Sequence, residues 1–191
     1  MARLLILGAG GHGRSVAEIV VAENQHEFVG FLDDAPSANE RVDDWRVLGP
    51  ISLLDSYRRQ ADVVIVAIGS NRLREELHSR VDAAGFDLLT VTHPRAIVSA
   101  RARIGRGCAV MAGAIVANGA SLGEGVIVNC GAVIDHDCRV EDFGHLGVNA
   151  CMGGGSVLGR AAWMQAGATL GCGVHIKAGA VLQPGSSVGA H

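Results

Sequence analysis

Asp135-His136-Asp137 is the stretch of the sequence best suited to moving a proton. A neutral imidazole is a competent general base near pH 7, and a carboxylate beside it can orient the ring and stabilise its protonated form. General-base catalysis of this kind contributes roughly 10²–10⁴-fold to a rate. The stretch is therefore a candidate catalytic site, and the alternative interpretation is an exposed turn histidine.

A second stretch, Gly8-Ala-Gly-Gly-His-Gly13, has the residue types that surround phosphate. Its G-x-G-x-x-G spacing follows the apolar run Leu4–Leu7 and lets the backbone approach a phosphate at a helix N-terminus. Asp33 and Asp34 lie about twenty residues further on, where a dinucleotide-binding fold places a ribose-binding carboxylate. A nucleotide-bearing ligand fits this loop, unless the glycines only close a tight turn between strand and helix.

The elements that must position this loop form a small parallel sheet. After the first strand we expect a helix over 14–22 and a strand over 27–32. A strand over 62–68, a helix over 73–84 that Ser70 or Asn71 could cap, and a strand over 88–92 then follow. The carboxyl ends of such strands meet at one edge of the sheet, which is the usual ligand side.

The second half of the chain has a period of six. From Val98 to Val188 every sixth residue is aliphatic, and a small residue follows four positions later. Three hexapeptides make one triangular coil of a left-handed parallel β-helix, and the coils stack at about 4.8 Å. An amphipathic helix or a hairpin would need a period of 3.6 or 2 instead. Fifteen hexapeptides, 98–187, therefore predict five coils.

Residues eighteen apart stack in such a β-helix. His136 then has Asn118 one coil below and Gly154 one coil above, so a backbone amide lies about 5 Å from it along the axis. One oxyanion donor contributes about 10²–10³-fold, and a base beside such a donor suits acyl transfer. His145, stacked under Trp163, points outward half a coil from His136, so one subunit need not bring the two histidines together.

Composition excludes several classes of partner. A net charge of −3 without a Lys/Arg-dense run leaves no positive surface for nucleic acid. No segment approaches the roughly 18 apolar residues of a membrane span, and the opening apolar run is too short for a signal peptide. Five cysteines without a C-x-x-C pair favour reduced thiols. We expect a soluble, cytoplasmic protein.

Two domains are expected, a Rossmann-like domain over 1–94 and a β-helix over 95–191. A solenoid has exposed ends and flat faces, so it needs caps or partners. The first domain could cap the first coil. A cyclic homotrimer would match the triangular cross-section.

The chain resembles the PglD/NeuD-type nucleotide-sugar N-acetyltransferases of bacterial glycan biosynthesis over nearly its whole length. The motifs that show this resemblance are 6–13, 31–34, 67–71, His93-Pro94, and Asn129–Cys138 followed by His145. The resemblance implies a first domain that binds a UDP- or GDP-4-amino-4,6-dideoxy sugar. It also implies a homotrimer that binds acetyl-CoA between adjacent β-helices, without a metal.

The resemblance also implies roles for single residues. His136 would be the general base, Asp137 its acidic neighbour and Gly154 the backbone donor near the thioester carbonyl. Acetyl-CoA would contact His145, Gly154, Ala166 and Gly167, and the nucleotide-sugar would contact Gly10, Gly11, His12, Asp33, Asp34, Gly69 and Asn71. Relatives commonly end with an Asp-Val-Pro and Gly-x-Pro-Ala-Lys tail near the adenine of CoA, whereas this sequence stops at 183–191.

Four alternatives stay open at this point. The nearest is O-acetylation of a sialic-acid-type sugar, and another is a non-enzymatic solenoid that binds nucleotide-sugars. A nicotinamide oxidoreductase is less well supported, because the chain enters the β-helix where a second nucleotide-binding half should be. A zinc site shared between subunits could recruit His136, His145 and His175, but the sequence contains no closely spaced histidine pair.

Overall fold

The computed structural model describes residues 1–35 and 41–189, which form two compact units, Met1–Val91 and Thr92–His191. Each unit has its own apolar core.

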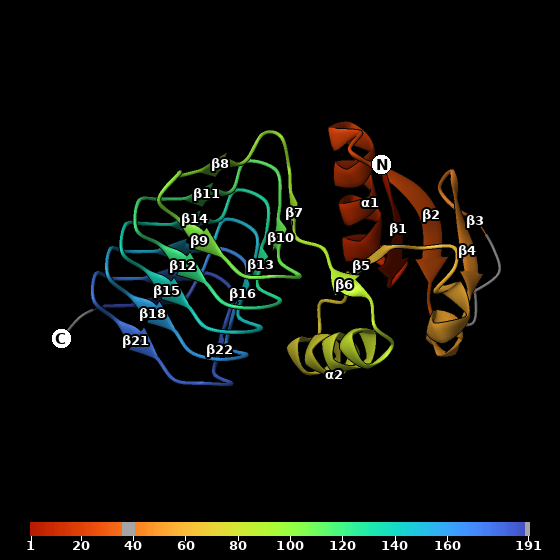
Figure 1. Ribbon diagram of the computed structural model, residues 1–191. Coiled ribbons are helices and arrows are strands. Elements are labelled where there is room, and N and C mark those ends of the chain that lie inside the picture. The colour runs from red at the N-terminus through yellow and green to blue at the C-terminus, as the bar shows by residue number, and fades with distance from the viewer. Residues whose placement is uncertain (36–40, 190–191) are drawn as a thin grey trace. The chain divides into compact units, whose positions relative to one another are not determined.

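The first unit is an α/β unit around one six-stranded sheet (Figure 1). The strand order is β3-β4-β2-β1-β5-β6, and β3 is antiparallel to β4 while the other pairs are parallel. The strands are β1 (Ala2–Leu7), β2 (His26–Leu32), β3 (Arg41–Val42), β4 (Trp45–Gly49), β5 (Val63–Val66) and β6 (Asp87–Leu88). The helices are α1 (Gly11–Glu23), α2 (Asn71–Ala83) and the 3-10 helix η1 (Ile51–Tyr57).

Strand β1 lies at the centre of this sheet, and the chain order reverses there. Leu4–Leu7 is fully buried, as expected for a parallel strand covered on both faces. β2 pairs with one side of β1 and β5 with the other. In open α/β sheets a ligand binds outside the carboxyl ends of the strands at such a reversal. The loops after β1 and β5 meet this condition.

The structure corrects the sequence expectation for the end of this unit. The expected single strand over 88–92 is wrong, because it is two strands that belong to different sheets. β6 pairs with β5, whereas β7 (Val91–Thr92) lies beside β10 in the second unit. No residue within 88–92 indicates where the backbone passes from one sheet to the other. The hairpin β3–β4 and η1 were also not anticipated.

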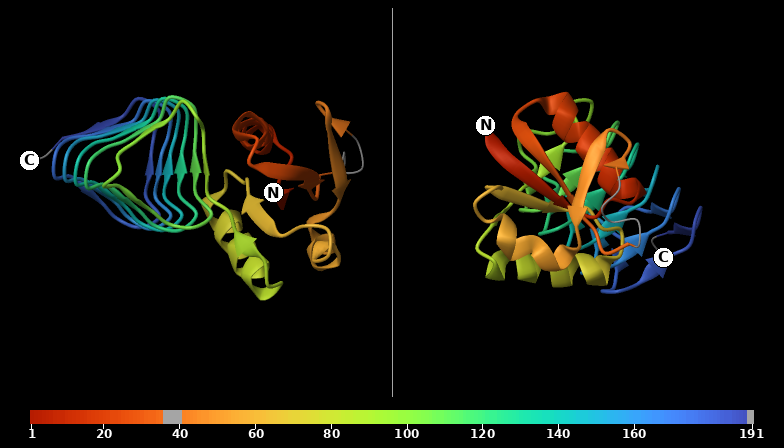
Figure 2. Two further views of the ribbon diagram at one scale, coloured as in Figure 1. Left: turned by 45° about the horizontal axis from the view of Figure 1, so that its top comes forward. Right: turned by 90° about the vertical axis from the view of Figure 1, so that its right-hand side faces the viewer.

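The second unit is the expected left-handed parallel β-helix, with a triangular cross-section in Figure 2. Sheet I contains β7, β10 (Ala109–Val110), β13 (Ile127–Val128), β16 (His145–Leu146), β19 (Trp163–Met164) and β22 (Val181–Leu182). Sheet II contains β8 (Ile97–Val98), β11 (Ile115–Val116), β14 (Val133–Ile134), β17 (Cys151–Met152), β20 (Thr169–Leu170) and β23 (Ser187–Val188). Sheet III contains β9 (Arg103–Ile104), β12 (Ser121–Leu122), β15 (Arg139–Val140), β18 (Val157–Leu158) and β21 (His175–Ile176).

The register of these sheets confirms the stacking of residues eighteen apart. Val133 pairs with Cys151, and Ile127 pairs with His145. The sixth-residue aliphatic side chains end the strands from β8 to β23 and fill the interior. The coil starts one strand earlier than expected, at β7, because Thr92 stands where the repeat otherwise has an aliphatic residue.

The corners of the β-helix explain the abundance of glycine. A left-handed φ recurs every sixth residue from 107 to 185, and ten of these fourteen positions are glycine. A residue with a Cβ pays roughly 1–2 kcal/mol in this region. The four other positions are Asp137, Phe143, Asn149 and Ala161.

Candidate active site at a corner of the β-helix

His136 lies in the turn between β14 and β15, where sheets II and III meet. Its ring rests directly against Gly154 of the next coil. A Cβ added to Gly154 would lie 2.5 Å from Nε2 and 2.6 Å from Cε1 of the ring. Only glycine therefore leaves room for the imidazole in this position.

Two carboxylates flank the ring on opposite sides. Nδ1 lies 3.0 Å from Oδ2 of Asp137, and Nε2 lies 3.9 Å from Oδ2 of Asp135. The hydrogen bond to Asp137 and, next, the charge of Asp135 raise the pKa of His136 above its ordinary value. When Nδ1–H donates to Asp137, Nε2 is the basic nitrogen. This nitrogen faces the next coil.

The backbone N–H of Gly154 is available as a donor. At the same position of other turns, the N–H groups of Glu124, Cys130 and His136 donate to carboxylate or amide oxygens. The Gly154 N–H has no such partner within 1–35 and 41–189. The basic Nε2 of His136 and the unused N–H of Gly154 thus belong to residues in direct contact. A base next to such a donor is the arrangement that acyl transfer to an amine requires.

Asp137 occupies one of the left-handed corner positions, with φ 58°. Its carboxylate lies beside Gly119 one coil below, where an added Cβ would overlap Oδ1. Most other turns have glycine at this position, so the left-handed φ of Asp137 is backbone strain at a candidate site.

The residues expected to contact acetyl-CoA lie on other parts of the same unit. Ala166 and Gly167 form the turn between β19 and β20, where sheets I and II meet. His145 begins β16 in sheet I, is only 7% exposed, and stacks on Trp163 with ring centroids 5.4 Å apart. One chain therefore brings His136 and Gly154 together but places the other three residues away from that corner.

The glycines of the first loop divide into two groups. Gly8 has φ 105°, and a Cβ on Gly13 would overlap the carbonyl oxygen of Gly8. These two positions close the turn and let α1 pack on β1. In contrast, a Cβ on Gly10, Gly11 or Gly69 would meet nothing within 4 Å among the residues described. Open space thus lies over the loops at the carboxyl ends of β1 and β5.

Asp33 and Asp34 have structural partners. The Asp33 carboxylate accepts hydrogen bonds from the N–H groups of Ala9 (2.6 Å) and Ala35 (2.7 Å). Asp34 accepts one from the N–H of Ile51 at 2.7 Å. Each carboxylate oxygen has two lone pairs, so these bonds leave acceptor capacity. Both residues hold the edge of the sheet in shape.

A buried arginine beside the loops was not anticipated from the sequence. Arg74 is fully buried and donates to the carbonyl of Ile68 (2.9 Å) and to Oδ1 of Asn71 (2.8 Å). Ser70 caps the same helix through the N–H of Leu73, as expected. In the sequence, Arg74 lies in the first turn of a polar helix and has the pattern of an exposed residue. Only its position shortly after Gly69, in the loop that follows β5, could have indicated that it is buried beside the ligand edge.

His12 is held neutral next to this arginine. Burial, and then the charge of Arg74, lowers the pKa of His12 to about 4. Its Nε2 is shielded from solvent and has no hydrogen-bond partner in the part of the chain that the structure describes. A buried ring nitrogen without a partner is rare in folded proteins, and here it lies at the glycine-rich loop.

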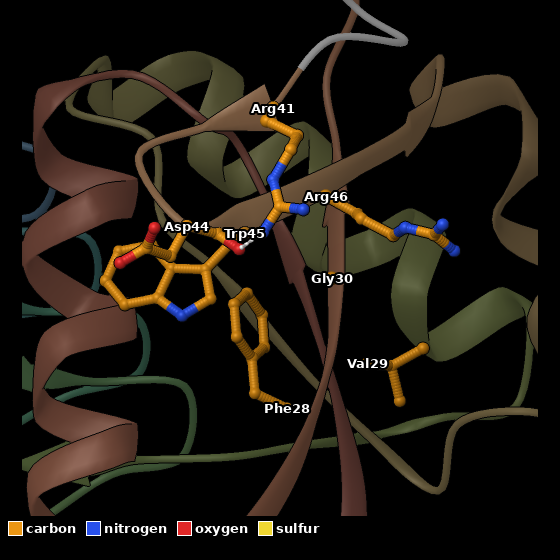
Figure 3. A pocket seen from close by; sticks show the side chains of 7 residues that line it. All are labelled: Phe28, Val29, Gly30, Arg41, Asp44, Trp45 and Arg46. Atoms are coloured by element: carbon orange, nitrogen blue, oxygen red, sulfur yellow. Dashed lines mark hydrogen bonds between the residues drawn. The ribbon is translucent and has the colours of Figure 1, made fainter.

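A hollow of about 250 Å³ lies elsewhere on the first unit, between β2 and β4 (Figure 3). These strands pair at Phe31–Val47 and Leu32–Gly49, with an irregularity between the two pairs. The hollow is lined by Phe28, Val29, Gly30, Arg41, Asp44, Trp45 and Arg46. It lies beside the bodies of the strands and not at their carboxyl ends, so it is separate from the glycine loops.

Within residues 1–35 and 41–189, none of the helices is both long enough and apolar enough to cross a membrane. Those residues also include no group of three or more His, Cys, Asp or Glu side chains placed to hold a metal ion.

A small parallel α/β unit followed by a left-handed β-helix is the architecture of the hexapeptide-repeat sugar acyltransferases. Comparison with known proteins agrees. Residues 3–81 match the family described as PglD N-terminal domain. The acetyltransferase domain of PglB from Neisseria gonorrhoeae is 38% identical, with a TM-score of 0.72 and coverage of 100% of this chain and 97% of that chain.

Two more relatives extend the comparison. PerB from Caulobacter crescentus, solved in complex with CoA and GDP-perosamine, is 35% identical, with a TM-score of 0.93 and coverage of 98% and 89% of the two chains. The UDP-N-acetylbacillosamine N-acetyltransferase of Bacillus subtilis is 34% identical over 113 residues, 59% of this chain. The match spans about half (52%) of that curated relative's length. The chain belongs to the PglD-type family of nucleotide-sugar N-acetyltransferases.

Proposed function

We propose that this protein transfers the acetyl group of acetyl-CoA to the amino group of a UDP- or GDP-linked 4-amino-4,6-dideoxy sugar. One observation carries the proposal. At the corner between sheets II and III, His136 has Nδ1 against Asp137, while Nε2 faces Gly154 and its unused N–H. The nucleotide-sugar N-acetyltransferases that this chain resembles support the same reaction.

The chemistry assigned to these residues is a general-base acyl transfer. Nε2 of His136 takes a proton from the sugar amine as its nitrogen attacks the thioester carbonyl. The Gly154 N–H stabilises the oxyanion that forms, and Asp137 stabilises the imidazolium. Collapse of the intermediate breaks the C–S bond, and the proton on Nε2 passes to the departing CoA sulfur. The products are the amide and CoA thiol.

The nucleotide end of the substrate is assigned to the carboxyl edge of the first unit. Gly10, Gly11 and Gly69 leave open space there, and α1 offers N–H groups and a partial positive charge to the phosphates. His12 supplies a neutral ring with an unpaired nitrogen. The remaining contacts are assigned to Asp33, Asp34 and Asn71.

The acetyl-CoA site is assigned to the interface of a homotrimer. Within one chain, His136 and the turn Ala166–Gly167 lie at different corners of the triangle. In a cyclic trimer, one corner of each β-helix faces a different corner of its neighbour. Acetyl-CoA between two subunits would then reach His136 and Gly154 of one subunit, and His145 and the Ala166–Gly167 turn of the other. We assign the reaction to the cytoplasm, where acetyl-CoA and nucleotide-sugars are available.

A substrate panel tests the proposed function. Release of CoA thiol is measured with acetyl-CoA and three acceptors, which are a UDP-4-amino sugar, a GDP-4-amino sugar and sialic acid. We expect turnover with one of the two amino sugars and none with sialic acid. Turnover confined to sialic acid would show O-acetylation, and no turnover with any acceptor would favour a binding role.

Replacing Asp137 with Gly separates catalysis from folding. Loss of the Nδ1 partner is expected to lower kcat/KM by about 10²-fold, because the ring loses its orientation and its stabilised cation. His136 works as a base only when it is neutral, so activity rises with pH through its raised pKa. Without Asp137 that pKa falls, and the acidic limb of the kcat/KM profile moves to lower pH.

The same variant is expected to unfold at an unchanged or higher temperature, because glycine relieves the left-handed backbone at this corner. Ala161→Gly is the matched control, since Ala161 has φ 53° at another corner. It should keep full activity and the same pH profile. A lower unfolding temperature for Asp137→Gly with an unmoved pH profile would make Asp137 a structural residue only.

A further inference from the structure

We infer that Asp135 is the residue that selects an amine over a hydroxyl acceptor, by binding the substrate's amino group beside His136. This inference rests on the proposed function and deepens it. The two carboxylates that flank His136 then have different tasks. Asp137 acts on the far ring nitrogen, and Asp135 acts on the substrate.

The Asp135 carboxylate is held in place from two sides. Its Oδ1 accepts the backbone N–H of His136 at 2.7 Å, and its own backbone N–H donates to the carbonyl of Met152 at 3.1 Å. Oδ2 has no hydrogen-bond donor among the described residues and lies 3.9 Å from Nε2. A fixed carboxylate oxygen with free acceptor capacity therefore lies on the basic side of the ring.

One position of a substrate nitrogen satisfies both groups. A typical hydrogen bond joins its two heavy atoms at about 2.9 Å. Nε2 and Oδ2 are 3.9 Å apart, which is less than the sum of two such bonds, so one substrate nitrogen can lie within hydrogen-bond distance of both. Asp137 cannot take this role, since its nearest oxygen lies 3.0 Å from Nδ1 on the other side of the ring. The geometry thus offers the amino group two acceptors at once.

A carboxylate at this position favours an amine for reasons of charge and of donor number. Near neutral pH an aliphatic amine is largely an ammonium ion, and charge-assisted hydrogen bonds are roughly twice as strong as neutral ones. The ammonium ion releases one proton to water, since the side chains of His136 and Asp135 are exposed. The amine still has an N–H for Asp135 and another for Nε2, whereas a hydroxyl has a single hydrogen and can satisfy only one of them.

The experiment compares two acceptors that differ in a single substituent. GDP-perosamine carries a 4-amino group, and GDP-D-rhamnose carries a hydroxyl in its place. Binding of each is measured by calorimetry in the presence of CoA, which carries no acetyl group, so no turnover occurs. Asp135→Asn keeps the shape and the Oδ1 acceptor but removes the charge. Asp135→Glu keeps the charge. Thermal unfolding of each variant shows whether the fold is retained.

We expect Asp135→Asn to weaken GDP-perosamine binding about tenfold and to leave GDP-rhamnose binding nearly unchanged. Asp135→Glu should restore part of the preference, and KM for acetyl-CoA should not change. Equal loss of affinity for both acceptors, or no loss for either, would overturn the role of Asp135. If the wild-type protein acetylates a UDP-4-amino sugar instead, the same pair is used with UDP. Failure of wild type to acetylate any amino sugar would remove the proposed function itself, and this role with it.

Discussion

Replacing His136 with Ala will lower kcat/KM for acetyl transfer by about 10³-fold, the largest loss expected from any single side chain of this protein. The general base contributes roughly 10²–10⁴-fold, and within residues 1–35 and 41–189 no other histidine lies in the turns at the corner between sheets II and III. The His136 side chain is 60% exposed, so its removal leaves no cavity. The midpoint of thermal unfolding should therefore stay close to that of the wild-type protein.

The measurement is single-turnover acetyl transfer over a range of pH, together with thermal unfolding. The acidic limb of the rate profile should disappear in His136→Ala, because the group that titrates is gone. His175→Ala is the matched control, since His175 is an exposed histidine on sheet III of the same β-helix. It should retain full activity. Retention of most activity by His136→Ala would contradict the proposed mechanism.

The sequence predicted the β-helix well because its period is strict. Each hexapeptide places one aliphatic residue inside, so the register of Val133 on Cys151 follows from counting alone. Counting also placed Gly154 over His136, and a close approach of these two residues is what the structure has. The start of the helix was missed by one strand, since Thr92 is polar at the position that defines the repeat.

The first unit was less predictable because its short elements depend on tertiary contacts. β3 has only two residues, and it is stabilised by pairing with β4, which no local pattern marks. Burial of Arg74 likewise depends on acceptors that the fold brings together, the carbonyl of Ile68 and the side chain of Asn71. The hydrogen bonds of Asp33 with the N–H groups of Ala9 and Ala35 are of the same kind.

At the candidate site, residue types could be predicted but not orientations. Asp135 and Asp137 are equivalent in the sequence, as neighbours of His136 on either side. The left-handed backbone at Asp137 turns its carboxylate toward Nδ1, whereas Asp135 directly follows β14 and keeps an oxygen on the side of Nε2. The difference in their expected effects, one on the pH profile and one on acceptor choice, arises from this geometry.

Gly154→Ala will lower kcat/KM by about 10²-fold or more while the protein stays folded. The new methyl group would lie 2.5 Å from Nε2 of His136, and its backbone is not in the left-handed region, so the ring must move and the chain need not. Movement of the ring breaks the alignment of Nδ1 with Asp137 and of Nε2 with the substrate. A misplacement of about 1 Å can cost 10²-fold in rate.

Two other glycines of the β-helix make this prediction specific. At Gly153 a Cβ would lie 2.9 Å from backbone atoms of Cys172 and Leu170, so Gly153→Ala must push the next coil away and should destabilise the fold by about 1–3 kcal/mol. At Gly189 a Cβ meets nothing within 4 Å among the described residues, so Gly189→Ala should change neither property. Thermal unfolding and kcat/KM are measured for all three variants. Each control isolates one effect of an added methyl group. A loss of stability in Gly154→Ala like that of Gly153→Ala would contradict the prediction, and so would full activity like that of Gly189→Ala. In either case the contact with the His136 ring would not be the reason for glycine at position 154.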